Sequence, residues 1–111
     1  EMAFIATLPL PDGSEEMIGD VRGLGDPDNL EAEFGVLVRS DMKGHRLGWI
    51  LMDKLIRYLR AHGTQRIVGA VLRENDGMLG LGRKLGFHIS VHPEDPDLRH
   101  LELPLQTAQR A

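Results

Sequence analysis

The chain has 111 residues, of which 41% are hydrophobic and 27% charged, and this composition is typical of one small globular domain with a single core. The formal net charge of −4 argues against a nucleic-acid backbone as a partner, and the lack of cysteine excludes disulfides and thiol catalysis. No apolar run approaches the roughly 20 residues that cross a membrane and no signal-peptide pattern is present, so we expect a cytoplasmic protein that does not enter a membrane.

The first third of the chain predicts three antiparallel strands. Residues 2–8 are apolar on both alternating faces, which favours a strand that is covered on two sides. The dipeptide Asp12-Gly13 is a hairpin signal, and it leads into a more polar strand at residues 16–24. The third strand covers residues 32–38, and we expect the three strands to form a meander.

The rest of the chain predicts two helices and three further strands. The expected elements are a helix at about 46–61, a strand at 66–72, a helix at 76–85, and strands at 87–92 and 98–103. A strand–helix–strand sequence makes a right-handed crossover, so the strand at 66–72 should lie parallel to the strand at 32–38. In the second helix, Met78, Leu81 and Leu85 are predicted to form the inner face. Residues 1–105 then form one domain, and residues 106–111 form a frayed tail.

The turn before the first helix combines glycine with positive charge. Residues 43–48 read KGHRLG, and the first turn of a helix has N–H groups without internal partners and a dipole that favours negative charge. The turn therefore predicts an anion site, most simply for a pyrophosphate. It matches neither the Walker pattern nor the dinucleotide fingerprint, and from this stretch alone a plain strand-to-helix connection is an equally good interpretation.

Two stretches together carry a resemblance to a known family. KGHRLG follows a strand ending in Val38 and resembles the motif (Arg/Gln)-x-x-Gly-x-(Gly/Ala) of the GNAT acyltransferase superfamily, with Arg46 where the family usually has its middle glycine. Downstream, NDGMLGLGRKLGF at residues 75–87 is similar to the family's Asn-led helix that ends in Lys-Leu-Gly-Phe. The two motifs occur in the family's order, and the resemblance covers most of the chain.

The resemblance implies an α/β (α+β) fold: a mixed, mostly antiparallel sheet with one central parallel strand pair and two helices. Family members usually have another strand and two helices before the point where this sequence starts. We therefore expect an N-terminally truncated domain or the tail domain of a longer protein. The sheet edge that this leaves bare favours dimerisation or strand exchange, so a homodimer is a possible assembly.

The resemblance also implies a binding site for acetyl-CoA. By analogy with the family, the pyrophosphate would be held by the turn, and the pantetheine would pair with the edge of the third strand. The cofactor-binding residues implied in this way are Val36, Leu37, Val38, Lys43, Gly44, His45, Arg46, Leu47, Gly48 and Asn75. Without the resemblance, Leu37 and Val38 are plain strand residues, and Asn75 is an ordinary N-cap.

Glu33 is the candidate general base. Phe34, Val36 and Val38 fall on one face of the third strand and Glu33 falls on the other, among small or apolar neighbours. If that face is buried, desolvation raises the pKa of the carboxyl toward that of a useful base; otherwise Glu33 is a solvated strand residue. In similar acyltransferases a glutamate on this strand often acts as the base, sometimes through water, while an amide near Val38 holds the thioester oxygen.

Gly82 marks a departure from the family, because many members place a tyrosine there as general acid for the leaving thiolate. A lysine amine, with a pKa of about 10.4, costs about 4.6 kcal/mol to deprotonate at pH 7, whereas a thiol of pKa about 8.5 lies only about 2 kcal/mol away. Loss of the acid is therefore tolerable and loss of the base is not. The five histidines show no metal-ligand spacing, and no metal is expected.

These observations predict an acyl-CoA-dependent N-acetyltransferase that transfers acetyl from acetyl-CoA to an amine. The stretches AEFGVLVRSDMKGHRLG and MLGLGRKLGF are most similar to the acetyltransferase domain of bacterial protein lysine acetyltransferases that act on acyl-CoA synthetases. A protein lysine is therefore the expected acceptor. A non-catalytic acyl-CoA-binding regulatory domain and a small-molecule N-acetyltransferase remain as alternatives, the former because Arg46 can crowd the pyrophosphate.

Overall fold

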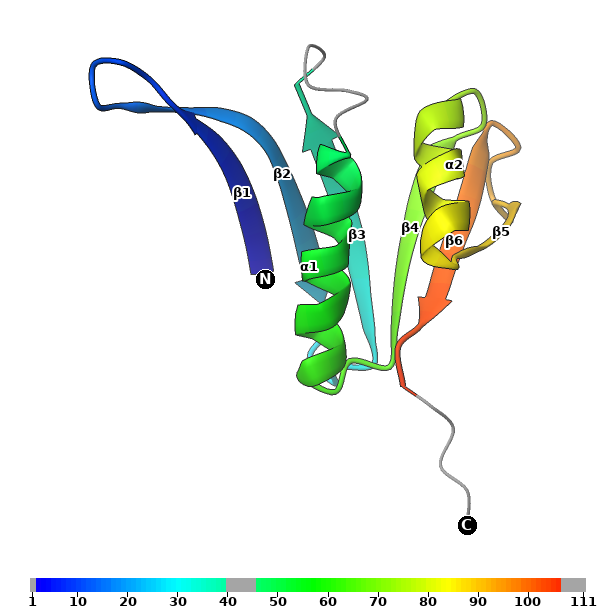
Figure 1. Cartoon of the computed structure of the whole chain (residues 1–111). Coiled ribbons are helices and arrows are strands. Elements are labelled where there is room, and N and C mark those ends of the chain that lie inside the picture. Colours follow the sequence, from blue (N-terminus) through cyan, green and yellow to red (C-terminus); the bar gives the residue numbers. More distant parts are fainter. Residues whose placement is uncertain (1, 40–45, 107–111) are drawn as a thin grey trace.

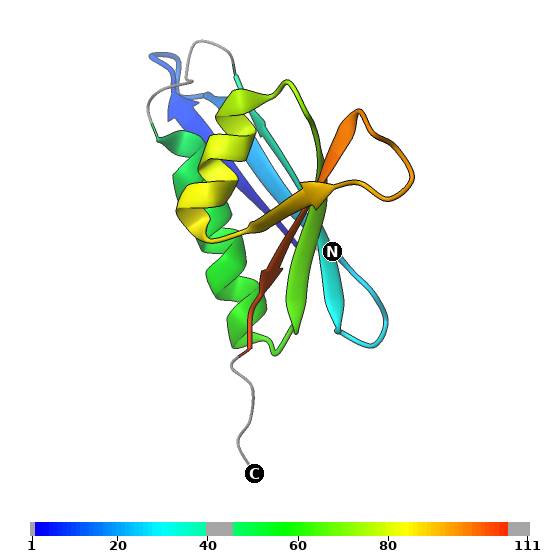
Figure 2. The same cartoon turned by 90° about the vertical axis from the view of Figure 1, so that its right-hand side faces the viewer.

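The computed structural model describes residues 2–39 and 46–106, which form a single mixed sheet with two helices on one face (Figures 1 and 2). The elements are β1 (Met2–Pro9), β2 (Glu15–Gly25), β3 (Glu31–Val38), α1 (Leu47–Ala61), β4 (Arg66–Leu72), α2 (Asp76–Leu85), β5 (His88–Val91) and β6 (Leu98–Pro104). The strand order is β1-β2-β3-β4-β6-β5. Every neighbouring pair is antiparallel except β3 and β4, so the predicted sheet with its one central parallel pair is confirmed.

Helix α1 covers the middle of the sheet with an apolar stripe at helical spacing. Its buried side chains are Leu51, Met52, Leu55, Ile56 and Leu59. They pack on the inward residues of the strands, including Val21, Ala32 and Ile67, which have no exposed surface. The helix ends at Ala61, and Gly63 follows it with a φ of 82°, a left-handed conformation that favours glycine. Within the described residues, neither helix is long and apolar enough to cross a membrane.

The inner face of α2 differs from the sequence prediction. The buried residues are Leu79 and Gly82, whereas Met78, Leu81 and Leu85 are half-buried at the edge of the core. The face of the helix that is buried against the sheet is therefore centred on Leu79 and Gly82. The close approach at Gly82 makes this packing possible, because a larger side chain there would hold the helix further from β6.

The prediction that the first strand is covered on both sides is wrong. β1 is an edge strand, paired only with β2, and its residues alternate between half-buried and exposed. Phe4 faces the helices and packs edge-on against Tyr58, while Ile5 faces away and is 60% exposed. The strand's apolar outer face lacks a covering layer within residues 2–39 and 46–106.

Side-chain hydrogen bonds join the segments where β3 begins and β4 follows α1. The Asn29 side chain donates to the His62 carbonyl at 2.8 Å and accepts from the Thr64 hydroxyl at 2.7 Å. The Gln106 amide donates to the carbonyl groups of Arg60 and Thr64, at 3.0 and 2.9 Å. Thr64 is 1% exposed, so its hydroxyl is shielded from water, whereas Asn29 and His62 lie at the surface; together these bonds join the start of the parallel pair to the end of α1.

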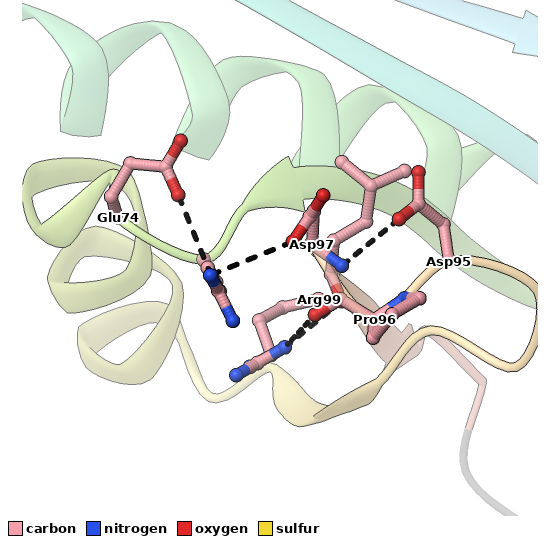
Figure 3. A network of polar contacts seen from close by, with 7 residues as sticks. Glu74, Asp95, Pro96, Asp97 and Arg99 are labelled. Atoms are coloured by element: carbon pink, nitrogen blue, oxygen red, sulfur yellow. Dashed lines mark hydrogen bonds and ion pairs between the residues drawn. The ribbon is translucent and has the colours of Figure 1, made fainter.

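A second polar cluster lies at the opposite end of β4. Figure 3 shows Glu74 and Asp97 on either side of one guanidinium, which belongs to Arg73, at 4.0 and 3.6 Å. The Asp97 N–H also donates to Asp95 at 2.9 Å, and Arg99 donates to the Pro96 carbonyl at 3.1 Å. These contacts shape the β5–β6 turn and attach it to the end of β4. All of the ion-paired side chains are largely exposed, so each pair contributes little to stability.

Candidate active site

Strands β3 and β4 pair over only three residues and then separate. Their parallel register joins Glu31 to Arg66, Ala32 to Ile67 and Glu33 to Val68, and it ends there. Beyond that point the two ribbons diverge toward the N-terminal end of α1 (Figure 1). The rest of β3, from Phe34 to Val38, therefore has a strand neighbour on its β2 side and no described strand paired with it on the other.

Backbone alternation shows which groups of β3 face the gap. The Arg39 N–H donates to the Ile18 carbonyl at 2.8 Å, so the odd-numbered residues of β3 point toward β2. The Leu30 carbonyl accepts from the Arg66 N–H at 3.0 Å, so the even-numbered residues point toward β4. The backbone groups of Val36 and Val38, which lie beyond the last β3–β4 pair, thus face the gap without a partner on β4. Unpaired backbone donors in this position can bind an extended ligand.

An aromatic ring occupies the point where the strands separate. A Cβ atom at Gly69 would lie 2.2 to 2.7 Å from three ring carbons of Phe34, so this ring rests directly on the backbone of β4. The ring also packs against Phe87, with centroids 5.5 Å apart, and Phe34 is 9% exposed. Only glycine at position 69 admits the ring there, which makes Phe34 and Gly69 a matched pair at the start of the gap.

The predicted phosphate turn is placed only in part. Lys43, Gly44 and His45 lie outside the described residues. Arg46 is the N-cap of α1 with φ 62° and ψ 14°, the left-handed conformation that glycine adopts at least cost. Its guanidinium carbon lies 5.3 Å from the Trp49 ring centroid, a cation–π arrangement on the side of the helix.

The first turn of α1 fits an anion. It contains no acidic residue, so its dipole and its unpaired N–H groups are not already neutralised. Gly48 has a packing role in addition to the predicted anion role, because a Cβ atom there would lie 3.3 Å from Leu81 of α2 and 3.9 Å from Val38. Leu47, the first helical residue, is half-buried beside it.

Glu33 lies on the open face of the sheet, opposite the helices, and its side chain is exposed. The burial on which the sequence-based case for a general base partly rests is therefore absent. Its cross-strand neighbours are Leu24 on β2 and Val68 on β4, at the last pair before the strands separate. The carboxylate is consequently accessible from solvent at the edge of the gap.

Asn75 and Gly82 have clear structural roles. The Asn75 side chain accepts from the Met78 N–H at 3.2 Å, so Asn75 is the N-cap of α2. Gly82 points toward β6, where a Cβ atom would lie 2.8 Å from a methyl carbon of Leu101. A tyrosine at position 82 would therefore need the Leu101 side chain to move, which accounts physically for glycine at this site.

The residue that sequence reasoning missed is Asp20. Together with Met17, Ile18, Gly19, Leu37, Val38 and Arg39 it lines a pocket of about 320 Å³ at the end of β3. A depression of similar size lies at the carboxyl end of α1, far along the chain from both motifs. The pattern IGDVRG contains a signal for this residue, since apart from Arg22 it places one acid in a run of apolar residues and glycines.

These features define a class of protein: a sheet with an unpaired strand edge leading to the N-terminus of a central helix, arranged to hold an extended ligand with an anionic end. The family model for the acetyltransferase (GNAT) family matches residues 4–87, and the chain belongs to this family.

Among curated proteins, an L-methionine sulfoximine/L-methionine sulfone acetyltransferase of Pseudomonas aeruginosa is 43% identical over 58 residues. That match covers 52% of this chain and 34% of the relative, so it spans about a third of the relative's length. A protein of the same description from Pseudomonas paraeruginosa matches equally well.

Solved structures share the fold at low identity. The ribosomal-protein-S18-alanine N-acetyltransferase of Escherichia coli superposes with a TM-score of 0.70 and 22% identity, over 84% of this chain and 64% of that chain. The structure of yncA from Salmonella typhimurium with its cofactor acetyl-CoA gives a TM-score of 0.71 and 22% identity, over 87% of this chain and 65% of that chain.

Proposed function

We propose that this chain transfers an acetyl group from acetyl-CoA to an amine. The observation that carries the proposal is the unpaired backbone edge at Val36 and Val38, which leads toward the N-terminus of α1. A pantetheine arm is an extended chain with amide groups, and it can pair with such an edge. The pyrophosphate would then lie at the turn of residues 43–48, where the helix dipole and the basic residues of the sequence favour it.

The proposed reaction is direct attack of the amine nitrogen on the thioester carbon, with breakage of the C–S bond. The Val38 amide is the proposed donor to the thioester oxygen, and Glu33 is the proposed proton acceptor. Val38 lies five residues from Glu33, which is about 16 Å along an extended strand. A proton released beside Val38 would therefore reach Glu33 only through bridging water, whereas one released near Val36 has a shorter path.

For the acceptor, we propose a lysine side chain on another protein. The support is the resemblance of residues 32–48 and 78–87 to lysine acetyltransferase domains, together with the exposed position of Glu33 on an open sheet face. A long amine side chain protruding from a folded partner can reach such a face. A small amine is the second candidate, because the Pseudomonas relative that is 43% identical acts by its name on L-methionine sulfoximine or L-methionine sulfone.

The decisive experiment combines binding and transfer. Calorimetry with acetyl-CoA should show saturable binding, and mass spectrometry should show acetylation of a lysine peptide or of L-methionine sulfoximine, whichever acceptor is correct. We expect Glu33→Gln to lower kcat/KM by about 100-fold or more with little change in the Kd for acetyl-CoA. Glu94→Gln, in the exposed β5–β6 turn, is the control and should behave as the unaltered protein.

Absence of heat with acetyl-CoA at high concentration would contradict the proposal as a whole. Binding without transfer to either acceptor class would favour the regulatory alternative. If Glu33→Gln retains full activity in a protein that does acetylate an amine, then the role of Glu33 is wrong while the proposed activity stands.

A further inference from the structure

Asp20 is a carboxylate in an unusual position on the open face of the sheet. It lies on β2 directly between Ile5 of β1 and Leu37 of β3, its two cross-strand partners. These neighbours are 60% and 67% exposed, yet Asp20 itself is 7% exposed. A carboxylate withdrawn from water in this way is costly unless it has partners, so its surroundings need an explanation.

The charge of Asp20 is only weakly compensated within the described chain. Its ion pair is with the Arg22 side chain, which is 61% exposed and lies 3.5 Å away from Nε to Oδ1. An ionised carboxylate can accept about four hydrogen bonds, and no side-chain hydrogen bond to Asp20 occurs among the described residues. Among the described residues, no fully buried side-chain oxygen lacks a partner, so the Asp20 oxygens keep a small accessible surface, and Asp20 is one of the residues that line the pocket.

The position of Asp20 relative to β3 matters for the chemistry. Leu37 is its direct partner, and Val38 is the partner of the preceding residue, Gly19. Directly opposed residues in an antiparallel pair have Cβ atoms about 5 Å apart. The Val38 N–H points away from β2 into the gap, so Asp20 and this amide lie on opposite sides of β3, about one strand width apart, whereas Glu33 lies about 16 Å away along the strand.

The pocket also provides walls for an alkyl chain. Met17 and Leu37 line it and are 51% and 67% exposed, so their apolar surface is available at the pocket. Its volume of about 320 Å³ is ample for an unbranched amine of four or five carbons. A carboxylate combined with apolar walls is the arrangement that a primary alkylammonium group requires, because the charge pairs with the acid and the methylenes pack on the walls.

From this juxtaposition we propose that Asp20 binds the ammonium group of the acceptor and takes its proton when the acyl group is held at the Val38 amide. The inference rests on the proposed acetyl transfer and adds a second carboxylate to that site. The acceptor R–NH₃⁺ gives one proton to the Asp20 carboxylate, and the neutral nitrogen attacks the thioester carbon. The C–S bond breaks, the second proton passes to the thiolate to give the free thiol, and Asp20 returns its proton to water.

The primary test is Asp20→Asn, which keeps the shape of the side chain and removes its charge. We expect kcat/KM for the acceptor to fall by about 100-fold or more, with the Kd for acetyl-CoA unchanged within about two-fold. Thermal stability should be unchanged or higher, because the variant no longer buries a charge with one exposed partner. Glu15→Gln, an exposed acid on the same strand that does not line the pocket, is the matched control and should keep full activity.

Two further measurements separate a catalytic role from a structural one. Arg22→Gln removes the ion pair but leaves the carboxylate, so it should lower kcat/KM by much less than Asp20→Asn. Titration of the full chain with n-butylammonium chloride should shift the amide resonances of Gly19 and Leu37, and Asp20→Asn should abolish these shifts. The titration requires no acetyl-CoA and therefore tests the pocket even if the proposed acetyl transfer fails.

The inference is overturned if Asp20→Asn keeps activity within about three-fold while Glu33→Gln loses it. It is also overturned if Arg22→Gln reproduces the whole loss, since the ion pair would then explain the effect, or if butylammonium produces no shifts at Gly19 and Leu37. Failure to bind acetyl-CoA in calorimetry would instead contradict the proposed function. The butylammonium titration would then be the test of amine binding at Asp20.

Discussion

Arg46 occupies a backbone conformation that suits glycine better than any residue with a side chain. Its φ of 62° lies in the left-handed region, at the N-cap of α1. The GNAT motif usually has glycine here, and glycine adopts this conformation at the least cost. The Arg46 side chain stacks beside Trp49, so it lies along the helix and partly compensates for the backbone strain.

This geometry predicts different effects for two substitutions of Arg46. Arg46→Ala removes the charge and keeps the strained conformation, whereas Arg46→Gly removes both. Arg46→Gly should therefore be more stable than Arg46→Ala by about 1 kcal/mol in urea denaturation. If the guanidinium contributes to pyrophosphate binding, both variants should weaken acetyl-CoA binding equally in calorimetry. Tighter binding by Arg46→Gly would show instead that the side chain crowds the anion.

At the scale of single residues, the sequence was most informative where the role of a residue depends only on its side chain and on the local backbone. Asn75 was predicted as an N-cap, and its hydrogen bond to the Met78 N–H confirms this. The exposure of Glu33 and the burial of Asp20 could not be predicted, because both depend on which neighbouring strands and side chains cover the open face. Strand alternation assigns a residue to a face, but it does not say whether that face is covered.

Helix α2 contains one glycine that lies close to a side chain of β6 and another that has free space around it. Both Gly80 and Gly82 lie within the helix, where alanine is preferred by about 1 kcal/mol. A Cβ atom at Gly80 meets nothing within 4 Å, whereas a Cβ atom at Gly82 would lie 2.8 Å from Leu101. The two positions therefore have the same helix propensity and different surroundings.

We expect Gly80→Ala to stabilise the protein by up to about 1 kcal/mol and Gly82→Ala to give less than this, or to destabilise it. The difference between the two free energies of unfolding measures the contact with Leu101. In the double variant with Leu101→Val, part of the penalty at position 82 should disappear. Equal stabilisation by both single alanine substitutions would contradict the close approach of α2 to β6.

At the scale of elements, hydrophobic periodicity predicted every described helix and strand to within about one residue at most ends. The strand at 66–72 and the helix at 76–85 were predicted with the bounds that the structure has. Periodicity was less informative about environment. An apolar run such as residues 2–8 suits both a central strand and an edge strand, and the structure places it at the edge. The order of strands in a sheet is a tertiary property that no single segment contains.

At the scale of the whole molecule, side-chain hydrogen bonds join the segments at the start of the parallel β3–β4 pair. At the far end of β3, the two strands are unpaired. Thr64 is central to the hydrogen-bonded end, since its hydroxyl donates to Asn29 and its carbonyl accepts from Gln106. The parallel pair itself was predicted from the strand–helix–strand order. Its early termination was implied only by family resemblance, because the Phe34–Gly69 contact that accompanies it joins residues far apart in the sequence.

Thr64→Val is expected to destabilise the fold by about 1–3 kcal/mol, because it removes the hydroxyl donor to the Asn29 side chain at a site with 1% exposure. Thr7→Val, on the exposed face of β1, is the matched control and should change stability by less than about 0.5 kcal/mol. Urea denaturation of both variants measures the difference. Equal midpoints for the two would show that the Asn29–Thr64 cluster does not stabilise the chain.

The three residue pairs between β3 and β4 have a consequence for the sheet as a ladder. Beyond Glu33 and Val68, β3 and β4 form no further residue pairs, and a bound molecule with its own amide groups would supply the missing hydrogen bonds. Occupancy would then complete the sheet, and the β1–β3 and β4–β6 halves would become one continuous unit. At a ligand concentration 100 times its Kd, such a partner adds about 2.7 kcal/mol to the stability of the native state. A ligand bound in this way would thus also serve as a strand of the sheet.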